Sequence, residues 1–119
     1  MLVIRNEQID AFSGHMEVTF INRVVAHLKE FWPEKCGEMG EEAVRESIHE
    51  AMDIARKFGI INEYDVARYI DLIFEFDWPA DEKPDTPWAE EILNDAELDG
   101  TVKMDRLFEE ANRILEGNS

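Results

Sequence analysis

The sequence of 119 residues contains one cysteine, Cys36, so the chain cannot form an internal disulfide. It also has few cations, since 12 Lys and Arg stand against 28 Asp and Glu, for a formal charge of -16. That charge argues against binding to nucleic-acid phosphate or to an anionic membrane. Apolar runs are far shorter than the ~20 residues that span a bilayer, so we expect no membrane segment. The lone cysteine and the missing secretory signal pattern predict a cytoplasmic protein.

Catalytic signatures are missing as well: there is no nucleophile-elbow serine and no glycine-rich phosphate loop. His49 and Asp53 would share a helix face, as two metal ligands do, but the zinc-protease pattern has a second histidine in place of Asp53. The acids of residues 77–85 lack the central glycine and final glutamate of an EF-hand loop, although a loosely held divalent ion there stays open. The sequence thus favours a non-enzymatic protein without a cofactor. A small metal-dependent hydrolase built on His49 and Asp53 is the alternative.

Two further residues that often carry chemistry have structural explanations. His27 lies between two apolar stripes, where a partly buried histidine with a hydrogen-bond partner is the common finding. Cys36 falls in an expected connection, where it can be exposed, but a reactive thiol needs a base and an electropositive setting to lower its pKa. Carboxylates dominate this chain, so we expect a free cysteine of no special reactivity.

What the chain does have is the balance of a folded protein, with 45% hydrophobic and 34% charged residues and a length that suits one domain. Apolar residues recur at steps of three or four in nearly every segment, which is the spacing of a helix face. Alternation of apolar and polar residues, the pattern of a strand, is limited to residues 74–78. The sequence therefore predicts an all-α fold, with a single compact domain of about five helices over residues 1–119.

The longest expected helix is N-terminal and runs from Ile9 to Trp32, where Pro33 ends it. Gly14 marks the place where a kink or a break would occur. The residues that follow, 33–40, include two glycines and predict a connection. Two adjacent apolar stripes give this helix a broad core face, formed by Phe12, Met16, Phe20, Val24, Leu28 and Phe31 and by Val18, Ile21, Val25 and Trp32.

The middle of the chain predicts two more helices with clear boundaries. Residues 43–58 form the first, which Gly59 ends in a left-handed conformation. Asn62 caps the second, which runs to about Phe76. Its core face should hold Val66, Tyr69, Ile70, Ile73 and Phe74, with Arg68, Asp71 and Glu75 outside.

The last third of the chain begins with an expected acidic loop, because residues 77–86 contain two prolines and four acids. Thr86 caps a short helix that ends near Leu93. Residues 94–100 form a further connection, and Thr101 caps the final helix.

Acidic residues are concentrated between residues 75 and 99, where ten acids accompany a single base, Lys83. The same stretch holds three large aromatic residues, and aromatic rings among charges are typical of interface hot spots. We therefore predict that it binds a basic protein. The other interpretation is that Trp78 and Trp88 fold back onto a small core while the acids keep the protein soluble. The candidate partner-binding residues are Phe76, Trp78, Asp81, Glu82, Asp85, Trp88 and Glu91.

An ordered set of short segments covers nearly the whole chain, from Ile4 to about Leu115. It consists of residues 4–8, residues 20–28, Phe31-Trp32-Pro33, Phe58-Gly59-Ile60, residues 65–70, Pro87-Trp88-Ala89, residues 92–95 and residues 103–107. This set resembles a group of small helical bacterial proteins encoded beside type VI secretion effector, spike-tip and lysozyme-like genes. The resemblance implies a setting in interbacterial toxin delivery, and it implies no activity and no catalytic residues.

Together these observations predict a non-catalytic protein-binding module that acts on a secreted antibacterial effector or cell-wall hydrolase. As an immunity-type inhibitor, it would cover a cationic cleft with its acidic segment and associate in a salt-sensitive way. As an adaptor or chaperone, it would bind through apolar helix surface and depend little on salt. The missing signal sequence favours the escort role or a cytoplasmic toxin. A regulator that mimics nucleic acid through its acidic surface is a further alternative, and the oligomeric state stays open.

Overall fold

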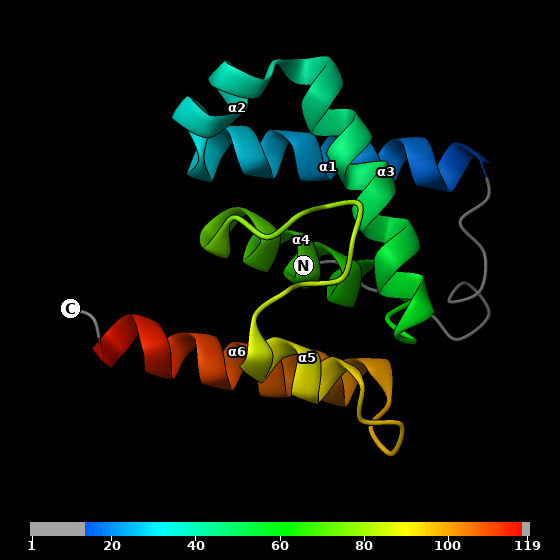
Figure 1. Ribbon diagram of the computed structural model, residues 1–119. Coiled ribbons are helices and arrows are strands. Elements are labelled where there is room, and N and C mark those ends of the chain that lie inside the picture. Colours follow the sequence, from blue (N-terminus) through cyan, green and yellow to red (C-terminus); the bar gives the residue numbers. More distant parts are fainter. Residues whose placement is uncertain (1–13, 118–119) are drawn as a thin grey trace.

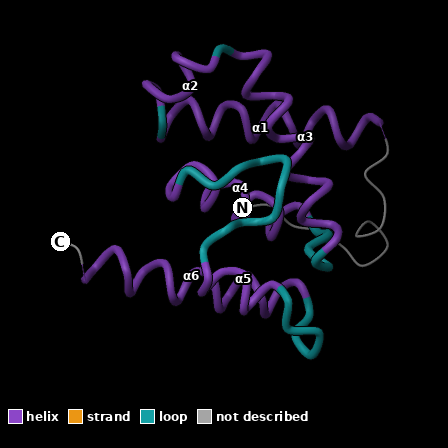
Figure 2. The backbone as a smooth tube through the Cα atoms, viewed as in Figure 1, coloured by secondary structure: helices purple, strands orange, loops and turns teal. Residues whose placement is uncertain are grey.

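Helices joined by short connections make up residues 14–117, the part of the chain that the computed structural model describes, with side chains from residue 17 (Figure 1). The backbone within this part contains helices and loops and no strand, which confirms the all-α prediction (Figure 2). The elements in chain order are α1 (Gly14–Phe31), α2 (Pro33–Met39), α3 (Glu41–Lys57), α4 (Glu63–Phe76), α5 (Pro87–Leu93) and α6 (Gly100–Gly117).

Helix α1 ends before Pro33 as predicted, but fewer of its apolar side chains are buried than its sequence pattern predicts. Phe20, Val24 and Leu28 are buried. Phe31 is 59% exposed and Val18 is 58% exposed, so their predicted places in the core are wrong. The neighbours of α1 are α2, α3 and α4, and they leave part of the broad stripe uncovered. The predicted start at Ile9 lies outside the described residues, and Gly14 is the first described residue of the helix.

The predicted connection over residues 33–40 is wrong, because most of it forms helix α2. A proline is compatible with the first turn of a helix, where its missing N–H costs no hydrogen bond. Cys36, expected in an exposed connection, is buried in the core, and this extra helix brings the described number to six against about five expected. Burial raises the pKa of the Cys36 thiol, although the nearby lysines Lys29 and Lys35 oppose the shift. The thiol is therefore shielded and predominantly protonated at neutral pH.

Helix α3 ends in the turn that the glycine predicted. Gly59 has a φ of 82°, and the N–H of Ile60 donates to the carbonyl of Ala55 at 3.0 Å, which closes the left-handed cap. The start of α6 packs directly on this turn, because a Cβ on Gly100 would lie 2.1 Å from the carbonyl oxygen of Gly59. Buried Lys103 donates from Nζ to the carbonyl of Phe58 at 2.9 Å, which places a cation at the negative end of α3.

Helix α4 is central, with contacts to α1, α3 and α6, and it lies between α1 and the α5–α6 pair (Figure 1). The predicted cap is confirmed, since the side chain of Asn62 accepts a hydrogen bond from the N–H of Asp65 at 2.9 Å. All five predicted core residues are buried: Val66, Tyr69, Ile70, Ile73 and Phe74. Arg68 was expected outside, but its side chain is only 15% exposed because it lies between the carboxylates of Asp65 and Asp105.

The predicted acidic loop over residues 77–86 is confirmed, as is a short helix up to Leu93. Thr86 is the N-cap residue of α5 as predicted, but its hydroxyl makes no cap hydrogen bond and accepts one from a tryptophan instead. The predicted Thr101 cap of α6 is wrong. The cap of α6 is Asp99, whose Oδ1 accepts from the N–H of Val102 at 2.9 Å, while the hydroxyl of Thr101 donates to Asp65. Within residues 14–117, every helix is too short or too polar to cross a membrane.

Candidate functional site

Three of the predicted partner-binding residues form one aromatic cluster. The ring centroids of Phe76 and Trp78 lie 5.5 Å apart, those of Phe76 and Trp88 lie 5.5 Å apart, and those of Trp78 and Trp88 lie 5.7 Å apart. Trp78 is 5% exposed and also approaches Tyr69 of the core, whereas Phe76 and Trp88 are partly exposed. Trp78 therefore holds the cluster on the core, and only Phe76 and Trp88 present ring surface to solvent.

The acidic loop is anchored at both of its ends. At its start, Asp77 adopts a left-handed backbone with φ 54°, and Lys35 of α2 donates to the carboxylate of Asp77 at 2.7 Å and to the carbonyl of Phe74 at 2.5 Å. At its end, the indole Nε1 of Trp78 donates to the hydroxyl of Thr86 at 2.9 Å. The loop thus crosses α4 in a defined path to α5, as the tube in Figure 2 shows.

The acids of this region face solvent. Nine of the ten acids between residues 75 and 99 are exposed, and Glu90 is intermediate. Asp77 pairs with Lys35, and Glu90 pairs with Lys83 at 3.1 Å. Four of the predicted partner-binding residues are acids, and none of these four forms an ion pair with another residue of the 14–117 range. These four residues, named the acidic surface below, are Asp81, Glu82, Asp85 and Glu91.

The acidic surface also affects the pKa of a neighbouring acid on α3. The pKa of Glu50 on α3 is raised, first by partial desolvation and then by the charges of Asp81 and Glu46. Asp81 therefore lies close enough to α3 for its charge to repel that of Glu50. A cation placed here would relieve that repulsion.

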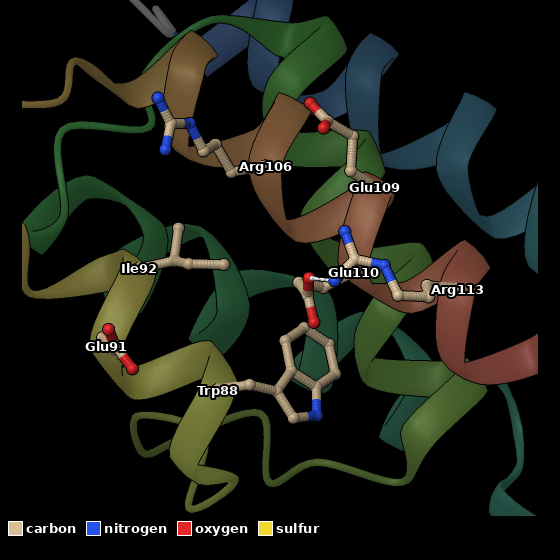
Figure 3. Close-up of a pocket in the computed structure, with 7 residues that line it drawn as sticks. All are labelled: Trp88, Glu91, Ile92, Arg106, Glu109, Glu110 and Arg113. Atoms are coloured by element: carbon tan, nitrogen blue, oxygen red, sulfur yellow. Dashed lines mark ion pairs between the residues drawn. The ribbon is translucent and has the colours of Figure 1, made fainter.

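Next to the acidic surface, a groove of about 530 Å³ lies between α5 and α6 (Figure 3). Figure 3 shows the indole of Trp88 and the side chain of Ile92 extending from α5 toward α6. On the α6 side, Arg113 pairs with Glu110, while Arg106 has no ion-pair partner within the described chain. The full lining is Trp88, Glu91, Ile92, Arg106, Glu109, Glu110 and Arg113. Its mixture of aromatic, aliphatic and charged groups suits a polypeptide better than a small apolar ligand.

The structure brings Trp88 and Glu91 to this groove, while Asp81, Glu82 and Asp85 lie on the adjoining loop. Sequence reasoning missed the α6 side of the groove. The available signal was the recurrence of charged residues at steps of three and four along one face of the last helix, from Arg106 to Arg113. That signal does not reveal which helix faces this row.

The alternative chemical sites are not assembled in the described part of the chain. His49 and Asp53 are both exposed, and Asp53 pairs with Arg56 at 3.2 Å. No group of three or more His, Cys, Asp or Glu side chains is arranged around a metal position among the described residues. His27 is partly exposed, and its Nε2 lies 2.7 Å from Oδ1 of Asp71, which agrees with the expected satisfied histidine.

The groove, the acidic surface and the aromatic cluster together form the candidate binding site of the described chain. The chain was compared with protein-family models, with curated proteins and with solved structures. None of the three comparisons found a match. The arrangement of its own residues therefore has to indicate what the chain binds.

Proposed function

We propose that the chain is a non-catalytic protein-binding module that holds a basic protein on the acidic surface and in the α5–α6 groove. The observation that carries this proposal is the set of exposed carboxylates without cationic partners beside the half-buried ring of Trp88. Each unpaired carboxylate is already at the surface, so a partner's lysine or arginine gains an ion pair without breaking one within the chain.

The two kinds of group have different tasks in binding. The formal charge of -16 attracts a cationic protein over several ångströms and raises its rate of association, and salt screens this attraction. Trp88 supplies apolar contact area that can be desolvated in the complex, as anchors at interface centres do. Trp78 acts indirectly, because it fixes the ring of Trp88 and the end of the loop through Thr86.

The resemblance to proteins encoded beside type VI secretion genes suggests the partner's class. We propose a secreted antibacterial effector or a cell-wall hydrolase, which the module meets in the cytoplasm as an adaptor or chaperone, or neutralises as an immunity protein. The exposed acids support electrostatic recognition in the immunity role, whereas an escort role would use apolar contact area such as that of Trp88. The salt dependence of the complex separates them, since neutralisation through the acidic surface is lost at high salt and an escort complex held by apolar contact is not.

The test is a tagged pull-down from the native bacterium, washed at low and at high salt and analysed by mass spectrometry. The partner is then purified, and its association is measured with a variant that carries Asp81→Lys, Glu82→Lys and Asp85→Lys. A matched control carries Glu34→Lys, Glu38→Lys and Glu42→Lys, which changes the net charge equally at exposed acids of α2 and α3 without ion pairs to other described residues.

We expect the loop variant to slow association by about tenfold or more and the control to slow it much less, because local charge dominates within a Debye length of about 8–10 Å. Equal effects of the two variants would refute the assignment of the surface. A pull-down that recovers no basic protein would refute the proposed partner class. Stoichiometric metal in the purified protein would favour the hydrolase alternative instead.

A further inference from the structure

A hollow lies at the corner where α1 meets α2 (Figure 1), and the proposed function does not use it. It has a volume of about 480 Å³ and shares no lining residue with the α5–α6 groove. Two aromatic side chains line it, from Phe31 at the end of α1 and from Trp32 between the two helices. The rest of the lining comes from α2: Pro33, Glu34, Lys35 and Glu38. This hollow is named the α1–α2 pocket below.

The two aromatic rings of the pocket are held in place by the fold and still reach solvent. The ring centroids of Phe31 and Trp32 lie 6.4 Å apart, and the ring planes are inclined at 58°. Phe31 rests on His27 at a centroid distance of 4.8 Å. Trp32 rests on Phe74 at 5.8 Å. Phe31 is nevertheless 59% exposed and Trp32 is partly exposed, so the pocket presents ring surface to a ligand.

The charge of the pocket is negative. Glu34 and Glu38 are exposed, and neither forms an ion pair with another described residue. The ammonium of Lys35 is already bound, because its Nζ donates to the carboxylate of Asp77 at 2.7 Å and to the carbonyl of Phe74 at 2.5 Å. The lining alone, with two glutamates and one lysine, has a formal charge of -1, and this becomes -2 once Asp77 is counted.

We propose that the α1–α2 pocket binds a small organic cation of the alkylated ammonium class. The face of an aromatic ring attracts a cation through its quadrupole, and cages of such rings recognise quaternary ammonium groups. Phe31 and Trp32 supply the rings, and the two unpaired glutamates supply the opposite charge. The same corner already contains one contact of this kind within the chain, since Nζ of Lys35 lies 5.8 Å from the ring centroid of Phe74.

Other classes of small ligand fit the pocket less well. Calcium takes about six or more oxygen ligands, whereas the pocket offers two carboxylates. Among the described residues, no group of three or more His, Cys, Asp or Glu side chains is arranged around a metal position. An anion is repelled by the two glutamates, and a neutral apolar ligand gains nothing from their charge. A cation that carries apolar surface uses both the rings and the carboxylates.

The test compares choline with its neutral isostere 3,3-dimethylbutan-1-ol, because the two compounds have nearly the same shape and differ in charge. Isothermal titration calorimetry on the full chain measures both, with the ionic strength held constant by sodium chloride. We expect choline to bind with a Kd of about 1–10 mM and the isostere to bind about fivefold more weakly or worse. Equal affinities for the two compounds, or no saturable binding of choline, would overturn the proposal.

A matched pair of aromatic variants tests the location. Phe31→Leu keeps an apolar side chain and removes the ring, so it should weaken choline binding by about fivefold or more. Tyr64→Leu changes an exposed aromatic residue of α4 outside the pocket and should leave choline binding unchanged. Both positions are exposed, so both variants should fold. Equal effects of the two variants would overturn the assignment of the pocket.

The two triple variants that test the proposed function also separate this pocket from the acidic surface. The variant with Glu34→Lys, Glu38→Lys and Glu42→Lys should abolish choline binding while it changes partner association little. The variant with lysines at residues 81, 82 and 85 should do the reverse, although both variants change the net charge equally. Equal loss of choline binding in both would overturn the pocket in favour of a net-charge effect. Loss of partner association in the α2 variant would also overturn the proposal, because the occupant would then be the basic protein.

Discussion

The hydroxyl of Thr101 donates a hydrogen bond to Oδ2 of Asp65 at 2.6 Å, which joins the first turn of α6 to the first turn of α4. Asp65 is 2% exposed, and its carboxylate also accepts from Nη2 of Arg68 at 2.6 Å and from Nδ2 of Asn62 at 2.8 Å. A buried carboxylate is stable only when cations and hydrogen-bond donors replace its water. This one residue thus connects the starts of two helices that pack against each other.

Asp65→Asn should therefore lower the free energy of unfolding by about 3 kcal/mol, because it leaves Arg68 partly buried without its nearest countercharge. Urea denaturation followed by circular dichroism measures the loss. The control is Asp53→Asn, which breaks an exposed pair with Arg56 and should cost below about 0.5 kcal/mol. Similar losses in both variants would show that the network around Asp65 adds no stability of its own.

Gly100→Ala should destabilise the protein by about 2 kcal/mol or more, because the added Cβ meets backbone, which cannot rotate away. The atoms it approaches belong to the turn at Gly59 and Ile60, at 2.1–2.9 Å. Gly37→Ala is the control, since a Cβ there meets nothing within 4 Å and an alanine inside a helix is favoured by about 0.5–1 kcal/mol. Thermal melting of the two variants should give midpoints on opposite sides of the wild type. A Gly100→Ala midpoint at or above the wild type would contradict the close packing of α6 on this turn.

Thr86→Val should cost about 1–2 kcal/mol, because the buried indole N–H of Trp78 loses its acceptor. Combining Thr86→Val with Trp78→Phe removes donor and acceptor together, so the double variant should lose less than the sum of the two single variants. Urea denaturation of the four proteins of this cycle measures the coupling. Additive losses would mean that the hydrogen bond does not anchor the loop.

Asp71→Asn tests a pH dependence. Burial raises the pKa of Asp71 above the ordinary 3.8, and the charge and hydrogen bond of His27 offset only part of this. The folded chain then holds the proton to higher pH than the unfolded chain, so the contribution of Asp71 to stability falls as the pH rises through the raised pKa. The stability of Asp71→Asn relative to the wild type should thus increase as the pH rises from the ordinary pKa of 3.8 through the raised pKa. Denaturation curves at a series of pH values measure it, and a constant difference would contradict the raised pKa.

Much of the helical structure follows from local sequence. The period of three to four residues, the cap at Asn62 and the glycine at position 59 locate α3 and α4 correctly. Helix α2 was missed, because two glycines and a proline suggest a connection while the burial of Cys36, which stabilises this helix, is a tertiary contact. Thr86 and Thr101 both fit the local rule for caps, yet the hydroxyl of Thr86 accepts from Trp78 and that of Thr101 donates to Asp65.

The sequence by itself determined that the described chain is helical and where most of its helices end, because these properties depend on neighbours within a few positions. It also determined that ten acids and three large aromatic residues occur together between residues 75 and 99. Only the tertiary structure decided that Trp78 is core while Trp88 borders a groove. It also decided that Arg68 is held between two carboxylates and that Phe31 is exposed while Val24, on the same apolar stripe, is buried. These outcomes depend on which helices come together, and helical periodicity gives the direction of each face without naming the element that covers it.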